Sequence, residues 1–335
     1  MIDINGKIKI PNKWEELTIQ QATDTVGLLM GLMSGAIPLK TFRILLLQAL
    51  TGYRRSRKRL SPEMQEQLEF NLVFLAEQLT YAIKPKYRDP DVLTVLSPEL
   101  QERLKMHFPY EVYEPVFVQE LTAVGSRLQY DPVPNLNMKQ NPLPVIHVGG
   151  KTFRGPVFTI DPNDVVQTDI VAGEFLLAGD YAEIYHKTGD MRYLDSLMSV
   201  YYRQGNGPFS QVDCERQIFM FKQIDARQKF LAYLFHCSIT EYLNNHPVYG
   251  IIFKSGGSQE PGSNFSGILY QMAKDNYGSI QEVSQILLSD FIGLMYKQLL
   301  DAVHTLHELK KTPGEIASQL KLSDDQIIDI LKDAN

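Results

Sequence analysis

Two groups of histidine and cysteine residues could bind a metal ion by residue type. His304 and His307 lie three residues apart in a helical pattern, where two imidazoles on one face can share a zinc ion. No third ligand is evident, and the order HTLHE differs from the H-E-x-x-H motif that joins zinc to a general base. Cys214, His236 and Cys237 could be pooled, but the cysteines form no C-x-x-C pair. The sequence therefore predicts no bound metal and no other cofactor.

A short glycine-rich stretch is similar to the end of a phosphate-binding loop. Gly149-Gly150-Lys151-Thr152 matches the last positions of G-x-x-x-x-G-K-[ST], but Val145 stands where the first glycine is needed. The flanking residues indicate a β-hairpin rather than a strand, loop and helix. A G-x-S-x-G motif and a convincing Cys/His pairing are also missing. We therefore expect a protein that is not an enzyme, with an enzyme of unrecognised type as an alternative.

One basic cluster could meet a partner. Clustered guanidinium groups suit phosphate or an acidic protein surface, and an ordinary solvated loop is the alternative. The whole chain has a net charge of −6, which argues against a general nucleic-acid-binding protein. The cluster consists of Arg54, Arg55, Arg57, Lys58 and Arg59.

Composition indicates a globular protein from a reducing compartment. Of the 335 residues, 44% are hydrophobic and 21% are charged, which are ordinary globular values. Two cysteines are too few for a disulfide framework. The start of the chain lacks a signal peptide's apolar core, and the longest apolar run is shorter than a membrane-spanning helix. We expect no membrane association.

Apolar periodicity predicts most of the chain to be helical. Ser279 and Glu282 form a capping box, and apolar residues then recur every three or four positions to Leu306, which predicts one long helix. A second long helix is expected over residues 213–244. A third begins at Ser61-Pro62, and its predicted buried stripe consists of Met64, Leu68, Leu72, Leu75, Leu79 and Ile83.

Two β-hairpins are expected between these helices. Asn5-Gly6 between alternating isoleucines is a strong hairpin signal, and Gly149-Gly150 gives a second. The predicted fold class is mainly α: helical domains, hairpins near residues 2–10 and 145–160, and an independent C-terminal helix-turn-helix-like pair. The predicted divisions are an N-terminal domain (1–128), a proline-rich linker (129–144), a middle domain (145–253), a flexible loop (254–264), a helical pair (265–310) and a C-terminal module (311–335).

Glycines at intervals of four mark a possible close helix contact. Gly27, Gly31 and Gly35 fall within one apolar helical pattern, where small residues let another helix approach. We name this face as a candidate partner-binding surface.

The segment 311–333 resembles the helix-turn-helix of bacterial regulators through its E-I-A-x-x-L-x-x-S pattern. Asp324, Asp325 and Asp329 occupy the helix that would read DNA, where basic groups and donors are needed. We therefore interpret the segment as a docking module, with a DNA-binding regulator as the alternative. The candidate partner-binding residues of its last helix are Ile327, Ile328, Ile330 and Leu331.

Three stretches together resemble helical proteins encoded in the structural and tail-assembly regions of tailed bacteriophages and of prophages in Bacteroidetes-type hosts. They are residues 10–18 (IPNKWEELT), residues 179–203 with the sequence TGD at 188–190, and residues 267–283. The resemblance implies a virion structural or tail-assembly protein, chaperone- or scaffold-like, located in the host cytoplasm or the virion. Its partners would be other phage structural or assembly proteins, or a second copy of itself; nucleic acid is not expected.

Overall fold

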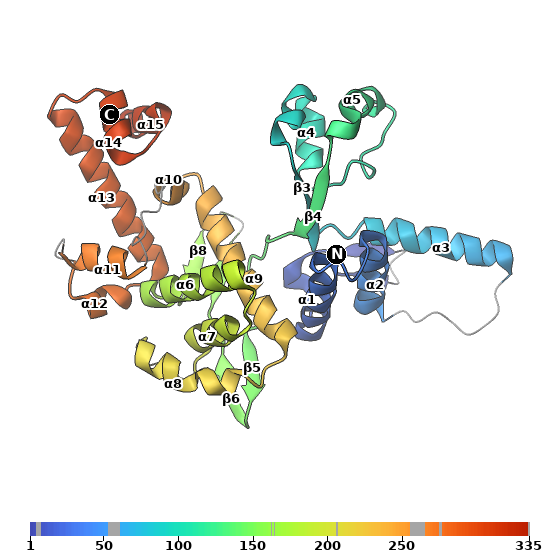
Figure 1. The fold of residues 1–335 in the computed structure, drawn as a ribbon, viewed down its shortest axis with the longest axis horizontal. Helices are drawn as coiled ribbons and strands as arrows, with labels where there is room; N and C mark the ends of the chain where they lie inside the picture. The colour runs from blue at the N-terminus through green and yellow to red at the C-terminus, as the bar shows by residue number, and fades with distance from the viewer. Residues whose placement is uncertain are drawn as a thin grey trace. The chain divides into compact units, whose positions relative to one another are not determined.

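The computed structural model describes residues 1–4, 8–52, 61–161, 163, 165–205, 207–254, 265–274 and 277–333. These residues are mainly helical, with four antiparallel sheets of two strands each (Figure 1). The predicted mainly α fold class is confirmed. The chain divides into two compact units, Met1–Met138 and Lys139–Asn335, and the division falls within the predicted linker.

The first unit combines helices with two small sheets. Strand β1 (Ile2–Ile4) pairs with β2 (Ile8–Ile10), which confirms the first predicted hairpin, although its Asn5-Gly6 turn lies outside the described residues. Strand β3 (Ile83–Tyr87) pairs with β4 (Tyr130–Pro134). The helices are α1 (Ile19–Met33), α2 (Leu39–Thr51), α3 (Pro62–Glu77), α4 (Pro98–Leu104) and α5 (Val118–Val124), with 3-10 turns η1 (Trp14–Glu16), η2 (Pro90–Val95) and η3 (Gly125–Arg127).

Side-chain hydrogen bonds determine where α1 begins. The hydroxyl of Thr18 accepts from the amide of Gln21 at 3.2 Å, and the Gln21 side chain accepts from the amide of Thr18 at 3.0 Å. Just before this cap, Trp14 is buried. Its indole Nε1 donates to the carbonyl of Asn135 at 3.0 Å, and its ring meets Tyr81 edge-on. The indole therefore connects the beginning and the end of the unit.

The proline-rich segment 129–144 is more than the predicted linker. Its residues 130–134 form strand β4. Its register with β3 runs from Ile83↔Pro134 to Tyr87↔Tyr130. A two-stranded sheet contains edge strands only, so a proline whose nitrogen faces away from the partner strand removes no ladder hydrogen bond. Beside this sheet, α4 and α5 enclose a small core of Tyr87, Val92, Leu96, Leu100, Leu104, Val112, Phe117, Leu121 and Val124.

The second unit begins with two sheets and continues as helices. Strand β5 (Val145–Val148) pairs with β6 (Lys151–Arg154), which confirms the second predicted hairpin, and β7 (Phe158–Ile160) pairs with β8 (Val166–Thr168), which was not predicted separately. The helices are α6 (Ala172–Thr188), α7 (Arg192–Tyr201), α8 (Gln211–Phe221), α9 (Ala226–Asn245), α10 (Gly250–Lys254), α11 (Phe265–Lys274), α12 (Ile280–Ser284), α13 (Leu288–Glu308), α14 (Pro313–Leu320) and α15 (Asp324–Asp333).

The core of the second unit lies where α6, α7 and α9 pack together. Aromatic contacts join the strands to it: Phe153 of β6 meets Phe221 of α8 with ring centroids 5.1 Å apart, and Phe158 of β7 meets Phe235 of α9 at 6.3 Å. The sheets are thereby attached to the helical layer. The buried helical residues include Leu194, Leu197, Met198, Leu231, Leu234 and Phe235.

Two predicted long helices are each divided in the structure. The helix expected over 213–244 is interrupted between α8 and α9, where the Asp225 carboxylate accepts from the amide of Arg227 at 2.8 Å and caps α9. The helix expected from Ser279 to Leu306 is interrupted between α12 and α13. There Leu287 pairs with Val171, because Ala172 donates to Ile286 and Leu288 to Ile170, both at 2.8 Å. Both single-helix predictions are wrong.

The C-terminal pair forms as predicted but is not independent. Thr312 and Glu315 make a capping box for α14, and Ser323 and Gln326 exchange equivalent hydrogen bonds at the start of α15. The pair shares one buried cluster with α13, formed by Val303, Ile316, Ala317, Ile327 and Ile330. A two-helix element has too little apolar surface to form its own core, so α13 supplies the remainder.

Adjacent residues of α15 test this shared core. Ile327 is fully buried, whereas Ile328 is 37% exposed. We expect Ile327→Ala to lower the free energy of unfolding by about 2 to 5 kcal/mol, because it leaves a cavity among α13, α14 and α15. The matched Ile328→Ala variant should change it by about 0.5 kcal/mol. Urea denaturation followed by circular dichroism measures both, and equal effects would contradict this packing.

Candidate partner-binding surface

Helix α3 leaves apolar side chains exposed over most of its length. Met64 is 59% exposed, Phe70 67% and Phe74 55%, and Ala76 is the one fully buried residue that this helix contributes. Phe70 and Phe74 are four residues apart and therefore lie on one face. Large apolar side chains that are exposed next to one another usually mark a binding surface.

The buried stripe predicted for this helix is therefore wrong at its start. Met64 is exposed and Leu68, Leu72 and Leu75 are only partly buried, whereas Leu79 and Ile83, beyond the helix, are fully buried. Periodicity shows which residues share a face, but it cannot show whether the same chain covers that face.

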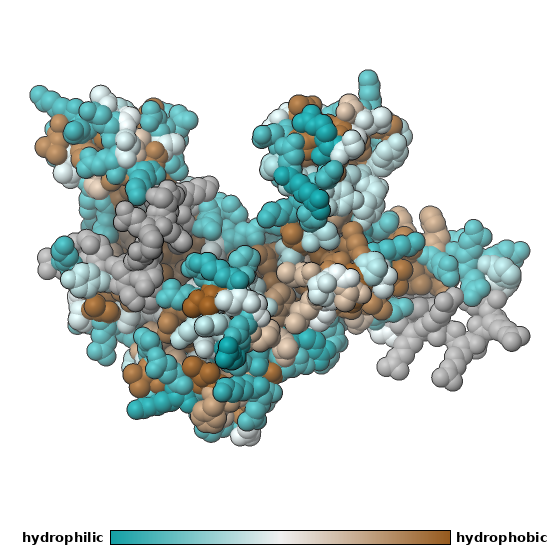
Figure 2. Space-filling model, viewed as in Figure 1, coloured by the Kyte–Doolittle hydropathy of each residue, from teal (hydrophilic) through white to brown (hydrophobic). Residues whose placement is uncertain are grey.

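A groove of about 490 Å³ runs between α2 and α3. Its apolar lining residues are Ile44 of α2 and Leu68, Phe70, Leu72 and Val73 of α3. In Figure 2 brown apolar residues and teal polar residues are interleaved over this part of the chain. The dimensions suit an inserted side chain or a helix face rather than a flat contact.

The polar residues that line this groove are of mixed character: Glu66 and Glu69 are acidic, Lys40 is basic, and Gln48 and Gln65 are neutral. Helix α3 itself contains Glu63, Glu66, Glu69 and Glu77 and no lysine or arginine. Complementary charge favours a partner with basic residues around an apolar stripe. We call the groove with Met64, Phe70 and Phe74 the α3 surface.

The predicted glycine face does not exist as one surface. Gly31 lies in α1, but a Cβ atom there would stand 2.5 Å from Cδ1 of Ile37, so the close approach is to the chain's own loop. Gly35 lies beyond the helix, with φ of +75°, where glycine is favoured. Gly27 is partly buried in α1. The three glycines do not share a helix because α1 ends at Met33.

The predicted apolar patch of the last helix is largely buried by the chain itself. Ile327 and Ile330 belong to the cluster around Val303, and Leu331 packs against its edge. Only Ile328 is exposed, beside Asp325 and Asp329. The prediction that this patch remains available to a partner is wrong for Ile327 and Ile330. Residues 54–59, the basic cluster, lie outside the described residues.

The histidine and cysteine candidates do not assemble into a metal site. His304 is partly buried and His307 exposed on α13. His236 is buried, and its Nδ1 forms a hydrogen bond of 2.6 Å with the hydroxyl of Tyr201. Burial lowers the pKa of His236 to about 4 and raises that of Cys237 to about 11. In the described part of the chain, no three His, Cys, Asp or Glu residues are grouped to hold a metal ion.

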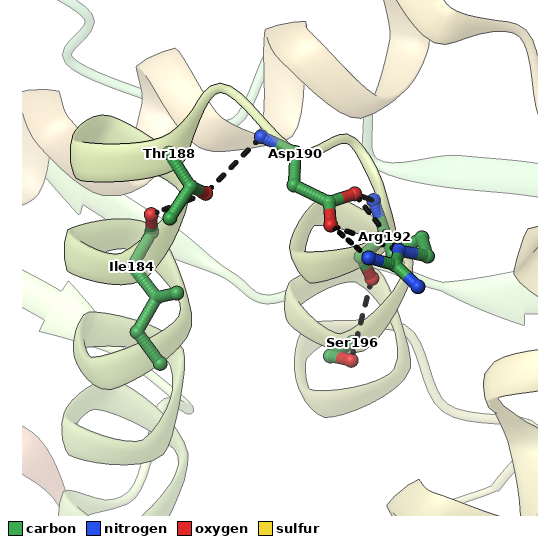
Figure 3. Close-up of polar contacts among 5 residues, drawn as sticks. All are labelled: Ile184, Thr188, Asp190, Arg192 and Ser196. Atoms are coloured by element: carbon green, nitrogen blue, oxygen red, sulfur yellow. Dashed lines mark hydrogen bonds and ion pairs between the residues drawn. The ribbon is translucent and has the colours of Figure 1, made fainter.

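Two sequence motifs prove to be turns. Gly149 and Gly150 have φ of 56° and 73° and form the turn of the β5–β6 hairpin, rather than a phosphate-binding loop. Figure 3 shows the TGD stretch between α6 and α7: the Thr188 hydroxyl accepts from the amide of Asp190 at 3.2 Å, and the Asp190 carboxylate binds the Arg192 side chain at 2.5 Å. These side chains therefore stabilise the connection between α6 and α7.

One functional candidate that sequence reasoning missed is a buried carboxylate in the second unit. Glu174 is 1% exposed; one oxygen accepts from the amide of Val171 at 3.1 Å, and the other lies 3.0 Å from Nε of Arg203. Burial raises the pKa of Glu174 to about 7, although the Arg203 guanidinium opposes the shift. Its partner is distant in sequence, so no local motif reveals the pair.

No protein-family model, no curated protein and no solved structure matches the chain. No helix in the described ranges is long and apolar enough to cross a membrane.

The raised pKa of Glu174 predicts a pH dependence of stability. Between the ordinary value of 4.5 and about 7, the folded protein binds more protons at this residue than the unfolded chain. The Glu174 contribution to the free energy of unfolding therefore falls as pH rises, by at most about 1.4 kcal/mol per pH unit. Above about pH 7 this contribution stays constant.

Urea denaturation at pH 5, 6 and 7 measures this contribution. We expect the Glu174→Gln variant to lack it, so the slope of its stability against pH should be more positive than that of the wild type. The substitution also removes the carboxylate partner of Arg203 and so changes the total stability. Only the slopes of stability against pH are therefore compared. Glu183→Gln, at a more exposed position of the same helix, is the control. Identical slopes for the wild type and Glu174→Gln would contradict the assignment.

Proposed function

We propose that this chain is a non-enzymatic structural or assembly protein that acts through protein–protein contacts, and that the α3 surface is one of its contact sites. The observation that carries the proposal is the exposure of Phe70 and Phe74 on α3, which the described residues of the first unit leave uncovered. Burying two such rings on a partner removes a large apolar area from water, which is the main favourable contribution to association.

The partner is expected to present a helix with an apolar stripe and basic flanks. The apolar stripe matches the groove lined by Ile44, Leu72 and Val73, and the basic flanks match the glutamates of α3. The acidic character of α3 also argues against two α3 helices packing side by side, since like charges would meet along the contact.

The narrower proposal is a virion structural or tail-assembly role in a tailed bacteriophage or prophage, in the host cytoplasm or the virion. Its support is the sequence resemblance over residues 10–18, 179–203 and 267–283. In the structure these stretches supply the Trp14 turn, the α6–α7 connection and the region of α11 and α12, all of them packing elements. Such elements suit a protein whose task is to present surfaces.

The DNA-binding alternative receives no support from the C-terminal pair. The first turn of α15 presents Asp324 and Asp325, and Asp329 follows on its exposed side. Phosphate groups would be repelled by these carboxylates, and two of the four apolar residues are already buried.

Substitution of the two phenylalanines tests the proposal. Phe70→Ser with Phe74→Ser should change the free energy of unfolding by about 0.5 kcal/mol, because both rings are exposed. Particle formation should nevertheless fail when this variant replaces the wild-type gene in the phage or prophage that encodes it. Electron microscopy and infectivity of induced cultures measure the result.

A matched control comes from the second unit. Val212→Ser with Phe219→Ser removes apolar groups of similar exposure, 55% and 64%, from α8. This variant should assemble normally. Normal particles from the α3 variant, or from a strain without the gene, would overturn the proposed function.

A further inference from the structure

A cavity of about 740 Å³ lies in the second unit, among the β-strands and the end of α7. About half of its lining is polar, whereas the groove between α2 and α3 is mostly apolar. The residues that matter for its chemistry are Asn141, Arg154, Thr159, Asp169, Tyr201 and Arg203. A cavity of this size can hold a small organic molecule.

Two arginines enter this cavity from paired positions. Arg154, at the end of β6, and Arg203, after α7, form an isolated antiparallel bridge: each amide donates to the other's carbonyl, at 2.9 and 3.0 Å. Side chains of residues paired in this way leave from the same side, with Cβ atoms about 4.5–5.5 Å apart. Two like charges so placed repel each other unless an anion lies between or beside them.

The carboxylates nearby neutralise these arginines only in part. Glu174, which is not among the lining residues, lies 3.0 Å from Nε of Arg203, and Nη1 of Arg203 donates to the carbonyl of Gly207 at 3.3 Å. The pKa of Glu174 is raised to about 7, so this carboxylate carries only part of its charge near neutral pH. Asp169 accepts from the amide of Val157 at 2.7 Å. Arg154 is exposed and forms no ion pair with another described residue.

We propose that this cavity binds the carboxylate or phosphate group of a small anionic ligand between the guanidinium groups of Arg154 and Arg203. Guanidinium groups bind both oxyanions through two parallel hydrogen bonds, which lysine cannot do. Thr159 supplies a hydroxyl group for the rest of the ligand, and the rings of Phe158 and Tyr201 supply apolar walls. This site goes beyond the proposed protein–protein contacts and does not depend on α3.

Titration calorimetry of the full chain tests the proposal. The two probes are inorganic phosphate and succinate, each titrated in chloride buffer at physiological ionic strength. The probe that binds with the lower dissociation constant shows whether the site prefers a phosphate or a carboxylate group. We expect saturable binding of at least one probe, weakened tenfold or more by Arg154→Gln. Arg154→Lys should restore only part of the affinity, since it keeps the charge but loses the paired hydrogen bonds.

The matched control is Arg216→Gln, which removes an arginine that lies on α8 and outside the cavity lining. It should bind the probe as the wild type does. Arg154 is exposed, so its replacement should leave the melting temperature of the unliganded protein unchanged. The proposal is overturned if neither probe binds, or if Arg154→Gln and Arg216→Gln bind equally well, which would indicate nonspecific attraction to surface charge. None of these outcomes depends on whether the α3 variant assembles.

Discussion

The buried carboxylate of Glu174 connects segments of the second unit that are far apart in sequence. It binds the amide of Val171 before α6 and the guanidinium of Arg203 after α7. Arg203 is paired with Arg154 of β6 through the backbone, and Val171 is paired with Leu287 between α12 and α13. Removing a carboxylate from water is unfavourable, so it has to retain partners. The positions of the hairpin, the helical core and the start of α13 thus depend on one another.

The first unit contains a corresponding buried pair with different surroundings. Arg43 of α2 pairs with Glu111, both nearly inaccessible to solvent, and its guanidinium lies 5.0 Å from the ring centroid of Phe108. The Glu111 carboxylate also accepts from the amide of Phe108 at 2.7 Å. This pair attaches α2 to the chain between α4 and α5. On α3, Phe70 and Phe74 in contrast remain exposed.

Features determined by neighbouring residues could be predicted from the sequence. The caps at Thr18, Ser279 and Thr312 and the hairpin at Gly149-Gly150 each depend on residues within one turn of chain. Features determined by distant residues could not. The break before α13 requires hydrogen bonds to Ile170 and Ala172, and an apolar period continues across it.

The same reasoning explains the candidate sites. The exposure of Phe70 and Phe74 depends on what the rest of the chain fails to cover, and a helical pattern does not reveal that. The pairing of Arg154 with Arg203 likewise depends on a backbone bridge between segments without a common motif. Of the predicted surfaces, Gly31, Ile327 and Ile330 pack against the chain itself, and Gly35 lies in an exposed turn beyond α1.

The buried indole of Trp14 has a spectroscopic consequence. It is the only tryptophan in the chain, and it belongs to the unit Met1–Met138. Its emission therefore reports the opening of that unit alone, through loss of the contact with Asn135 and of the apolar surroundings near Tyr81. Far-ultraviolet dichroism, in contrast, reports helices in both units. Comparing the two signals during denaturation distinguishes a single cooperative transition from two separate ones, without any label or truncation.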